Sequence, residues 1–211
     1  MAGMVILSHR GFWLEPQEKN TTVALERSRA EGFGTETDVR DLGGRLVISH
    51  DPPVGGEIGL SDLLDIFAGS GLTLAINIKA DGLSADLGAA FAERDIPWFA
   101  FDMSGPETVR YLAAGLPVFT RHSDVEPAPI CYEQSIGVWL DAFHGDWFGP
   151  ADVRAHLDAG KRVCIVSPDL HGRSPQPVWD WLKASGLHTH PRLSLCTDFP
   201  TEARDVFSTG G

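Results

Sequence analysis

The chain of 211 residues carries 17 lysines and arginines against 29 aspartates and glutamates, a formal net charge of −12, and 43% of its residues are hydrophobic. This composition excludes a disordered chain and disfavours a general nucleic-acid binder, because binding to a phosphate backbone needs a basic surface. At this length we expect a single domain, residues 1–211, with a substantial buried core.

The sequence predicts a cytoplasmic protein. No apolar run approaches the roughly 20 residues that span a bilayer. The apolar stretch 1–8 is too short for a signal peptide and lacks its basic residues. The three cysteines, Cys131, Cys164 and Cys196, are widely spaced and odd in number, which favours reduced thiols and no structural zinc site.

Short β-rich runs alternate with helix-like stretches along the chain. The runs that predict strands are 4–9, 35–39, 45–50, 72–79, 97–103, 117–122, 137–143, 162–168 and 192–200. The stretches that predict helices are 21–32, 61–69, 84–95, 106–115, 150–160, 177–186 and 201–207. A turn at Gly43 and Gly44 makes 45–50 the second arm of a hairpin, and Ser61 is expected to be a helix N-cap.

This alternation predicts an α/β fold with a parallel sheet. Eight strands alternating with seven or eight helical stretches, with 45–50 as a small insertion after strand 2, predict a compact parallel (β/α)8 TIM barrel with short loops. The alternative is a doubly wound open sheet, which would carry a glycine-rich fingerprint after its first strand. Neither that fingerprint nor a P-loop occurs in the sequence.

Polar residues gather where the predicted strands end, which is where barrel enzymes place their active sites. They are His9, Arg10, Glu36, Asp38, His50, Asp51, Asn77, Lys79, Asp102, Asp141 and Asp198. Side chains two residues apart on a strand point the same way, so Glu36 and Asp38 share a face. Paired carboxylates on a rigid strand suit a hard divalent cation such as Mg²⁺ or Ca²⁺, whereas the alternative is a solvated pair on an edge strand.

Two histidines flank this carboxylate pair in the sequence. His9 and His50 are candidates for a general acid and a general base, because an imidazole titrates near neutral pH. Arg10 could hold a phosphate or anchor Asp51.

Four segments together resemble the glycerophosphodiester phosphodiesterase family, within the phosphatidylinositol-phospholipase-C-like barrels. They are ILSHRG, TETDV, LVISHD and INIK, in this order, and the terminal CTDFP is similar to the family's last strand. The resemblance implies a metal-dependent phosphodiester hydrolase of lipid metabolism. Its partner would be a small phosphodiester substrate, with no nucleic acid and no membrane span.

The resemblance also implies residue roles. They are acid–base catalysis for His9 and His50, phosphate binding for Arg10 and Lys79, and binding of one Mg²⁺ or Ca²⁺ for Glu36, Asp38 and Asn77. The family's third strand usually carries Glu-x-Lys, with the Glu as a metal ligand. In this chain the position is Asn77, whose amide oxygen can still coordinate although the site loses one negative charge.

Other functions compete with this interpretation. Asn77 keeps open a catalytically weak or inactive barrel that only binds anions. A phospholipase-C-like or sphingomyelinase-D-like lyase would use a neighbouring substrate hydroxyl as the attacking group. An aldolase or isomerase could form a Schiff base on Lys79. His171 and Arg173 lie where a substrate-selecting loop, or an ordinary surface loop, would follow the run 162–168.

Overall fold

The computed structural model describes residues 3–208 of the chain. Its contacts cluster into two compact units. We call Ser8–Val118 the N-terminal unit, and Met1–Leu7 with Phe119–Gly211 the C-terminal unit. The single domain expected for residues 1–211 stays a prediction. Every helix in the described part of the chain falls short of the length and hydrophobicity that a membrane crossing requires.

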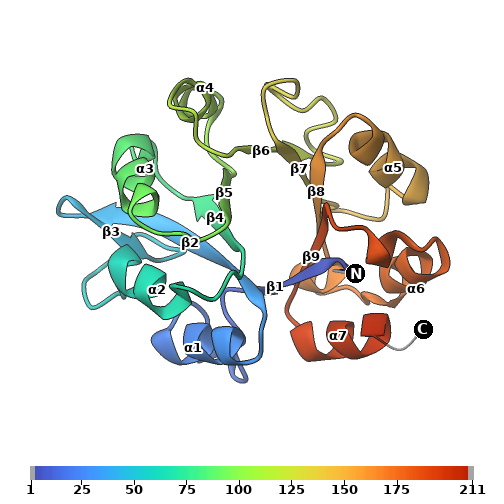
Figure 1. The fold of residues 1–211 in the computed structure, drawn as a ribbon, viewed down its shortest axis with the longest axis horizontal. Coiled ribbons are helices and arrows are strands. Elements are labelled where there is room, and N and C mark those ends of the chain that lie inside the picture. Colours follow the sequence, from blue (N-terminus) through green and yellow to red (C-terminus); the bar gives the residue numbers. More distant parts are fainter. Residues whose placement is uncertain (1–2, 209–211) are drawn as a thin grey trace. The chain divides into compact units, whose positions relative to one another are not determined.

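The N-terminal unit combines parallel strands, one antiparallel strand and their helices (Figure 1). Its strands are β2 (Gly34–Leu42), β3 (Arg45–Ile48), β4 (Leu74–Ile78) and β5 (Trp98–Phe101). Its helices are η1 (Pro16–Glu18), α1 (Thr22–Ala30), α2 (Leu60–Phe67), α3 (Ser84–Ala92) and α4 (Gly105–Ala113). β4 lies between β2 and β5 in parallel, with Asn77 opposite Asp38 on β2. β3 pairs antiparallel with β2, which confirms the predicted hairpin.

The C-terminal unit repeats the strand–helix alternation with parallel strands (Figure 1). Its strands are β6 (Phe119–His122), β7 (Gly137–Leu140), β8 (Arg162–Val166) and β9 (Leu193–Thr197). Its helices are α5 (Pro150–Asp158), η2 (Pro168–His171), α6 (Gln176–Ala184), η3 (Leu187–Thr189) and α7 (Pro200–Ser208). β6 and β7 begin with Phe119 opposite Gly137. A Cβ on Gly137 would lie 2.5 Å from the Phe119 ring, so only glycine fits this position.

The strand order follows the order of the chain. β1 (Val5–His9) contributes residues to both units, and the hydrogen-bonded order is β5-β4-β2-β1-β9-β8-β7-β6. Val118, one residue before β6 begins, also pairs in parallel with Ala100 of β5. A doubly wound sheet would reverse its strand order at a switch point. The order is therefore that of the predicted (β/α)8 topology.

One predicted helix start is wrong. Ser61 was expected to cap the helix, but α2 begins one residue earlier, at Leu60, with Gly59 as its N-cap. The reason is the side chain of Asp62, whose Oδ2 accepts a hydrogen bond from the Gly59 backbone N–H at 3.1 Å. A carboxylate at this third helical position satisfies an N–H that the helix leaves without a partner.

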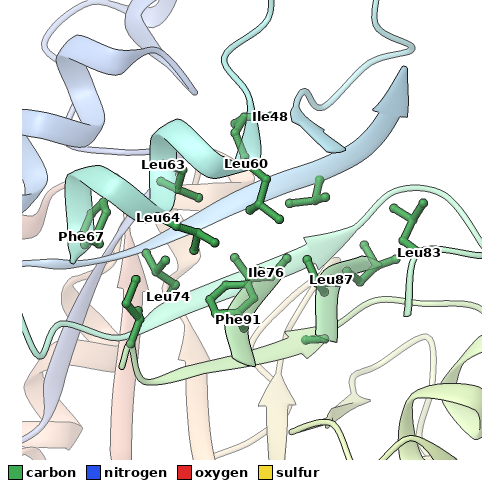
Figure 2. Packing of buried hydrophobic residues seen from close by; sticks show 14 of the residues in the cluster. Ile48, Leu60, Leu63, Leu64, Phe67, Leu74, Ile76, Leu83, Leu87 and Phe91 are labelled. Atoms are coloured by element: carbon green, nitrogen blue, oxygen red, sulfur yellow. The ribbon is translucent and has the colours of Figure 1, made fainter. Parts of the chain in front are cut away.

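The core of the N-terminal unit lies between its sheet and helices α2 and α3. Leu60, Leu63, Leu64 and Phe67 follow a helical spacing, so one face of α2 is buried. Figure 2 draws these side chains together with those of β4 and α3, in one buried cluster. Burying each such side chain contributes roughly 1.5–3 kcal/mol. This cluster fixes the strands whose ends carry the polar residues.

Candidate functional site

The residues predicted to form a site lie on the strands of the N-terminal unit or within two residues of their ends, and β2 continues to Leu42, beyond the predicted end of the run 35–39. They are His9 at the end of β1, Arg10 directly after it, Glu36 and Asp38 on β2, His50 after β3, Asn77 on β4 and Lys79 directly after it. All of them fall within residues 8–118, so one unit holds the whole candidate site.

Glu36 and Asp38 are buried carboxylates on one side of β2. Both are at most 2% exposed, and Asp38 is completely enclosed. A buried carboxylate is costly unless cations or hydrogen-bond donors lie beside it. The surroundings of this pair therefore determine whether the site is stable as it stands.

Asp38 is surrounded by positive and polar groups. Arg10 Nε lies 3.0 Å from its Oδ2, and Lys79 Nζ lies 3.4 Å from its Oδ1. Asn20 Nδ2 donates a hydrogen bond to Asp38 Oδ2 at 2.9 Å. The sequence predicts that Arg10 either contacts a phosphate or anchors Asp51. Neither role includes this ion pair with Asp38. With Glu36 ionised, two carboxylates face two cations, and the cluster has no net charge.

Glu36 has the most strongly altered titration in the cluster. Burial raises its pKa well above the ordinary value, and the neighbouring Asp38 charge raises it further. The Arg10 and Lys79 charges and a hydrogen bond from Asn77 act in the opposite direction. His9 Nε2 lies 3.9 Å from Glu36 Oε2. A protonated imidazole at His9 therefore has a carboxylate beside it whenever Glu36 is ionised.

The backbone after β1 is shaped by a close approach to α1. Arg10 and Gly11 have φ values of +59° and +86°. A Cβ on Gly11 would lie 2.8 Å from Ala24 Cβ and 2.9 Å from the Ala24 carbonyl carbon, which leaves room only for glycine. The Arg10 N–H donates to the Glu36 carbonyl at 2.9 Å. The His-Arg-Gly segment is thus held between β2 and α1.

His50 lies in a more open position. Its Nδ1 is 2.9 Å from Asp51 Oδ1, its side chain is 45% exposed, and the hydrogen bond to His50 lowers the pKa of Asp51. A cavity of about 770 Å³ is lined by His50 and Asp51 together with Arg10 and Asn20. The described residues that line this cavity do not include His9, Glu36, Asn77 or Lys79.

The residues expected to bind a metal leave buried oxygens without hydrogen-bond partners. Among the described residues these atoms include Glu36 Oε2, Asp38 Oδ1 and Asn77 Oδ1, one from each expected ligand. A hard divalent cation prefers such oxygens. However, no three His, Cys, Asp or Glu side chains within residues 3–208 converge on a metal position. The donor set fits a divalent ion, and the balancing charges of Arg10 and Lys79 favour weak binding.

Sequence reasoning missed Asn20 as a member of the site. It lies directly before the stretch 21–32, which the sequence predicts as a helix. Asparagine is enriched among non-glycine residues with positive φ, and Asn20 has a φ of +60°. The residue type is therefore the signal that the sequence offers for a turn at this position. The contact with Asp38 depends on how the loop between β1 and α1 folds back, which the sequence pattern does not encode.

In the C-terminal unit, His171 and Arg173 bind the loop that follows β7. His171 Nε2 lies 2.7 Å from Asp141 Oδ1, and Arg173 Nη1 lies 2.8 Å from Asp146 Oδ1. Arg173 also donates to the Ala142 carbonyl. These contacts connect the loops after β7 and β8, and the substrate-selecting role stays a prediction.

Comparison with known proteins shows the fold. No family model matches the sequence, and no curated protein matches it. Among solved structures, the chain is similar to a Ca²⁺-dependent phosphatidylinositol-specific phospholipase C from Streptomyces antibioticus, with a TM-score of 0.61 and 11% sequence identity. The match covers 98% of this chain and 96% of that one. The predicted α/β fold, a parallel (β/α)8 barrel with a hairpin inserted after strand 2, is confirmed.

Proposed function

We propose that this chain is a phosphoric diester hydrolase similar to the glycerophosphodiester phosphodiesterases. The observation that carries the proposal is the buried Glu36–Asp38 pair held by Arg10 and Lys79 at strand ends. The fold shared with a phospholipase C supports it, since barrel enzymes place their chemistry at this end of the strands. We place the activity in the cytoplasm, on small phosphodiesters of lipid metabolism.

Arg10 and Lys79 are proposed to bind the phosphate. Arg10 approaches Asp38 through Nε, so its two terminal nitrogens can donate to a phosphate oxygen. Lys79, directly after β4, supplies a second positive charge beside Asp38. Charge that develops on the phosphoryl oxygens during cleavage is stabilised by such fixed cations.

His9 and His50 are proposed to move the protons. One imidazole takes the proton of the attacking water, and the other gives a proton to the oxygen of the departing alcohol. The P–O bond to that alcohol breaks as the new P–O bond forms, and the products are a phosphomonoester and an alcohol. When Glu36 is ionised, its carboxylate, 3.9 Å from His9, stabilises the imidazolium form.

Glu36, Asp38 and Asn77 are proposed to hold one Mg²⁺ or Ca²⁺. Each of them has a buried oxygen without a hydrogen-bond partner, which supports this assignment. A divalent ion supplies, when bound, additional positive charge near the phosphate. The alternative of a weak or inactive anion-binding barrel is favoured by the neutral side chain at Asn77, which leaves the site without net negative charge.

A panel of phosphodiesters tests the proposal. The purified chain is incubated with glycerophosphodiesters of different alcohols, with Mg²⁺, with Ca²⁺ and with EDTA, and the released alcohol is measured. We expect release that depends on the divalent ion. Binding of the diesters without any release would favour the anion-binding alternative. In a separate incubation with a carbonyl substrate, borohydride trapping of that substrate on Lys79 would favour an aldolase.

Asn77→Glu is expected to tighten binding of the divalent ion. The variant adds one anionic oxygen beside Glu36 and Asp38, and hard cations favour anionic ligands. In both proteins the affinity should rise with pH, because the raised pKa of Glu36 makes the ion compete with a proton. Calorimetric titration with Mg²⁺ and Ca²⁺ at two pH values measures both effects. Equal affinities in wild type and variant would exclude position 77 from the metal site.

A further inference from the structure

Two residues with left-handed backbone conformation face each other beside the candidate site. Arg10 has a φ of +59° and Asn20 a φ of +60°. The Asn20 N–H donates to the Arg10 carbonyl at 2.8 Å, so the two strained residues are bonded directly. Non-glycine residues are uncommon in such conformations and concentrate at functional sites. This pair is therefore a place to look for a functional constraint.

The Asn20 side chain is oriented by contacts at both ends of its amide. Thr37 Oγ1 donates to Asn20 Oδ1 at 2.8 Å. Asn20 Nδ2 donates to Asp38 Oδ2 at 2.9 Å. Thr37 lies between Glu36 and Asp38 on β2 and is completely buried. Its hydroxyl group thus fixes which end of the amide meets the carboxylate.

Asn20 and Arg10 share one atom of Asp38. Arg10 Nε lies 3.0 Å from the Oδ2 atom that accepts the Asn20 hydrogen bond. Arg10 is also held at its backbone, by the Glu36 carbonyl on one side and the Asn20 N–H on the other. Both residues line the same cavity as His50. Asn20 therefore contacts the two groups that determine where the Arg10 guanidinium lies.

We propose that Asn20 is a positioning residue for phosphodiester cleavage. It holds the Arg10 and Asp38 side chains in a fixed position relative to each other, so that the terminal nitrogens of Arg10 meet the phosphate in one orientation. Thr37 acts through Asn20 by orienting its amide. This inference rests on the proposed function, because it assigns the phosphate to Arg10. It adds two residues to the site, neither of which contacts the phosphate.

Asn20→Gly is the decisive variant. Glycine adopts a positive φ without strain, so the backbone turn is retained while the amide is lost. We expect kcat/KM to fall by about 10–100-fold, the usual effect of removing a group that orients a catalytic side chain. Binding of inorganic phosphate, measured by calorimetry, should weaken in the same variant.

Asn20→Asp separates positioning from a merely structural role. Aspartate, like asparagine, adopts a positive φ more readily than most non-glycine residues, and it keeps a side chain of nearly the same size, so a merely structural role predicts that it outperforms glycine. A positioning role predicts the reverse order, because a carboxylate facing Asp38 repels it and cannot donate a hydrogen bond. An activity order of wild type, then Asn20→Gly, then Asn20→Asp supports the inference.

A double-mutant cycle tests the role of Thr37. Thr37→Val should lower kcat/KM in the wild type and have no further effect in Asn20→Gly, because the two act through one contact. Thr108→Val is the matched control, since Thr108 is a buried threonine of α4 whose hydroxyl donates to the Ser104 carbonyl at 3.0 Å. It should lose stability without losing kcat/KM. Additive effects of Thr37→Val and Asn20→Gly would overturn the assignment of Thr37.

The outcomes distinguish failure of the inference from failure of the proposed function. An active wild type whose kcat/KM and phosphate affinity are unchanged in Asn20→Gly would overturn the inference alone. A wild type that cleaves no diester but binds phosphate less tightly after Asn20→Gly would overturn the proposed function and keep Asn20 as a positioning residue for the anion. A wild type that neither cleaves diesters nor binds phosphate would overturn both.

Discussion

His9→Ala and His50→Ala are each expected to lower kcat by about 10²–10⁴-fold, the usual contribution of a positioned acid or base. Each imidazole moves one of the two protons, so neither can replace the other. Both residues lie at strand ends outside the hydrophobic core. The loss of activity should therefore come with little change in the thermal unfolding temperature. Steady-state kinetics and a melting curve on the same preparations measure both.

His144→Ala supplies the matched control for these variants. His144 is 81% exposed in the C-terminal unit, where its Nδ1 contacts Asp124 at 2.9 Å. Removing it deletes an imidazole–carboxylate pair like that of His50 and Asp51 without touching the candidate site. Its kcat should equal that of the wild type. An unchanged kcat in either His9→Ala or His50→Ala would reject the acid–base assignment of that residue.

Arg10→Ala is expected to lower kcat/KM by about 10²–10³-fold, as removal of one preorganised charged donor does in other enzymes. The variant removes a phosphate contact and leaves Asp38 buried with one cation fewer, so the unfolding temperature should fall as well. Arg10→Lys keeps the charge but loses the planar fork that binds two oxygens at once. We expect it to recover the stability more completely than the activity.

A surface arginine controls for the loss of charge. Arg94 forms an ion pair with Asp65 at 2.7 Å, and the two side chains are 33% and 63% exposed to solvent. Exposed pairs of this kind contribute little to stability, so Arg94→Ala should change neither kcat/KM nor the unfolding temperature appreciably. If Arg10→Ala retained the kcat/KM of the wild type, Arg10 would not be a phosphate ligand.

The strand pattern predicts the part of the arrangement that lies on neighbouring strands. Side chains alternate along a strand, and this period alone places Glu36 and Asp38 on one face. The parallel pairing of β4 with β2 then places Asn77 opposite Asp38. Such contacts follow from local geometry and strand order, which the sequence encodes through its alternation of strands and helices.

Contacts made by loops could not be predicted in the same way. The partner of Arg10 was expected to be a phosphate or Asp51, whereas its Nε lies beside Asp38. The reason is the sharp turn at Arg10 and Gly11, which returns the chain toward β2 and α1. Asn20 reaches Asp38 through the same turn. No periodic pattern describes a loop whose course depends on tertiary packing.

The most direct test of the central claim follows one phosphodiester by ³¹P NMR in ¹⁸O-labelled water. The wild-type chain, with Mg²⁺ or Ca²⁺, is expected to convert glycerophosphoethanolamine into a phosphomonoester that contains one ¹⁸O atom on phosphorus, and His9→Ala is expected to leave the diester intact over the same time. A diester signal that stays unchanged with wild-type protein and either ion would contradict the account. A cyclic phosphate as the final product would replace hydrolysis with the lyase reaction.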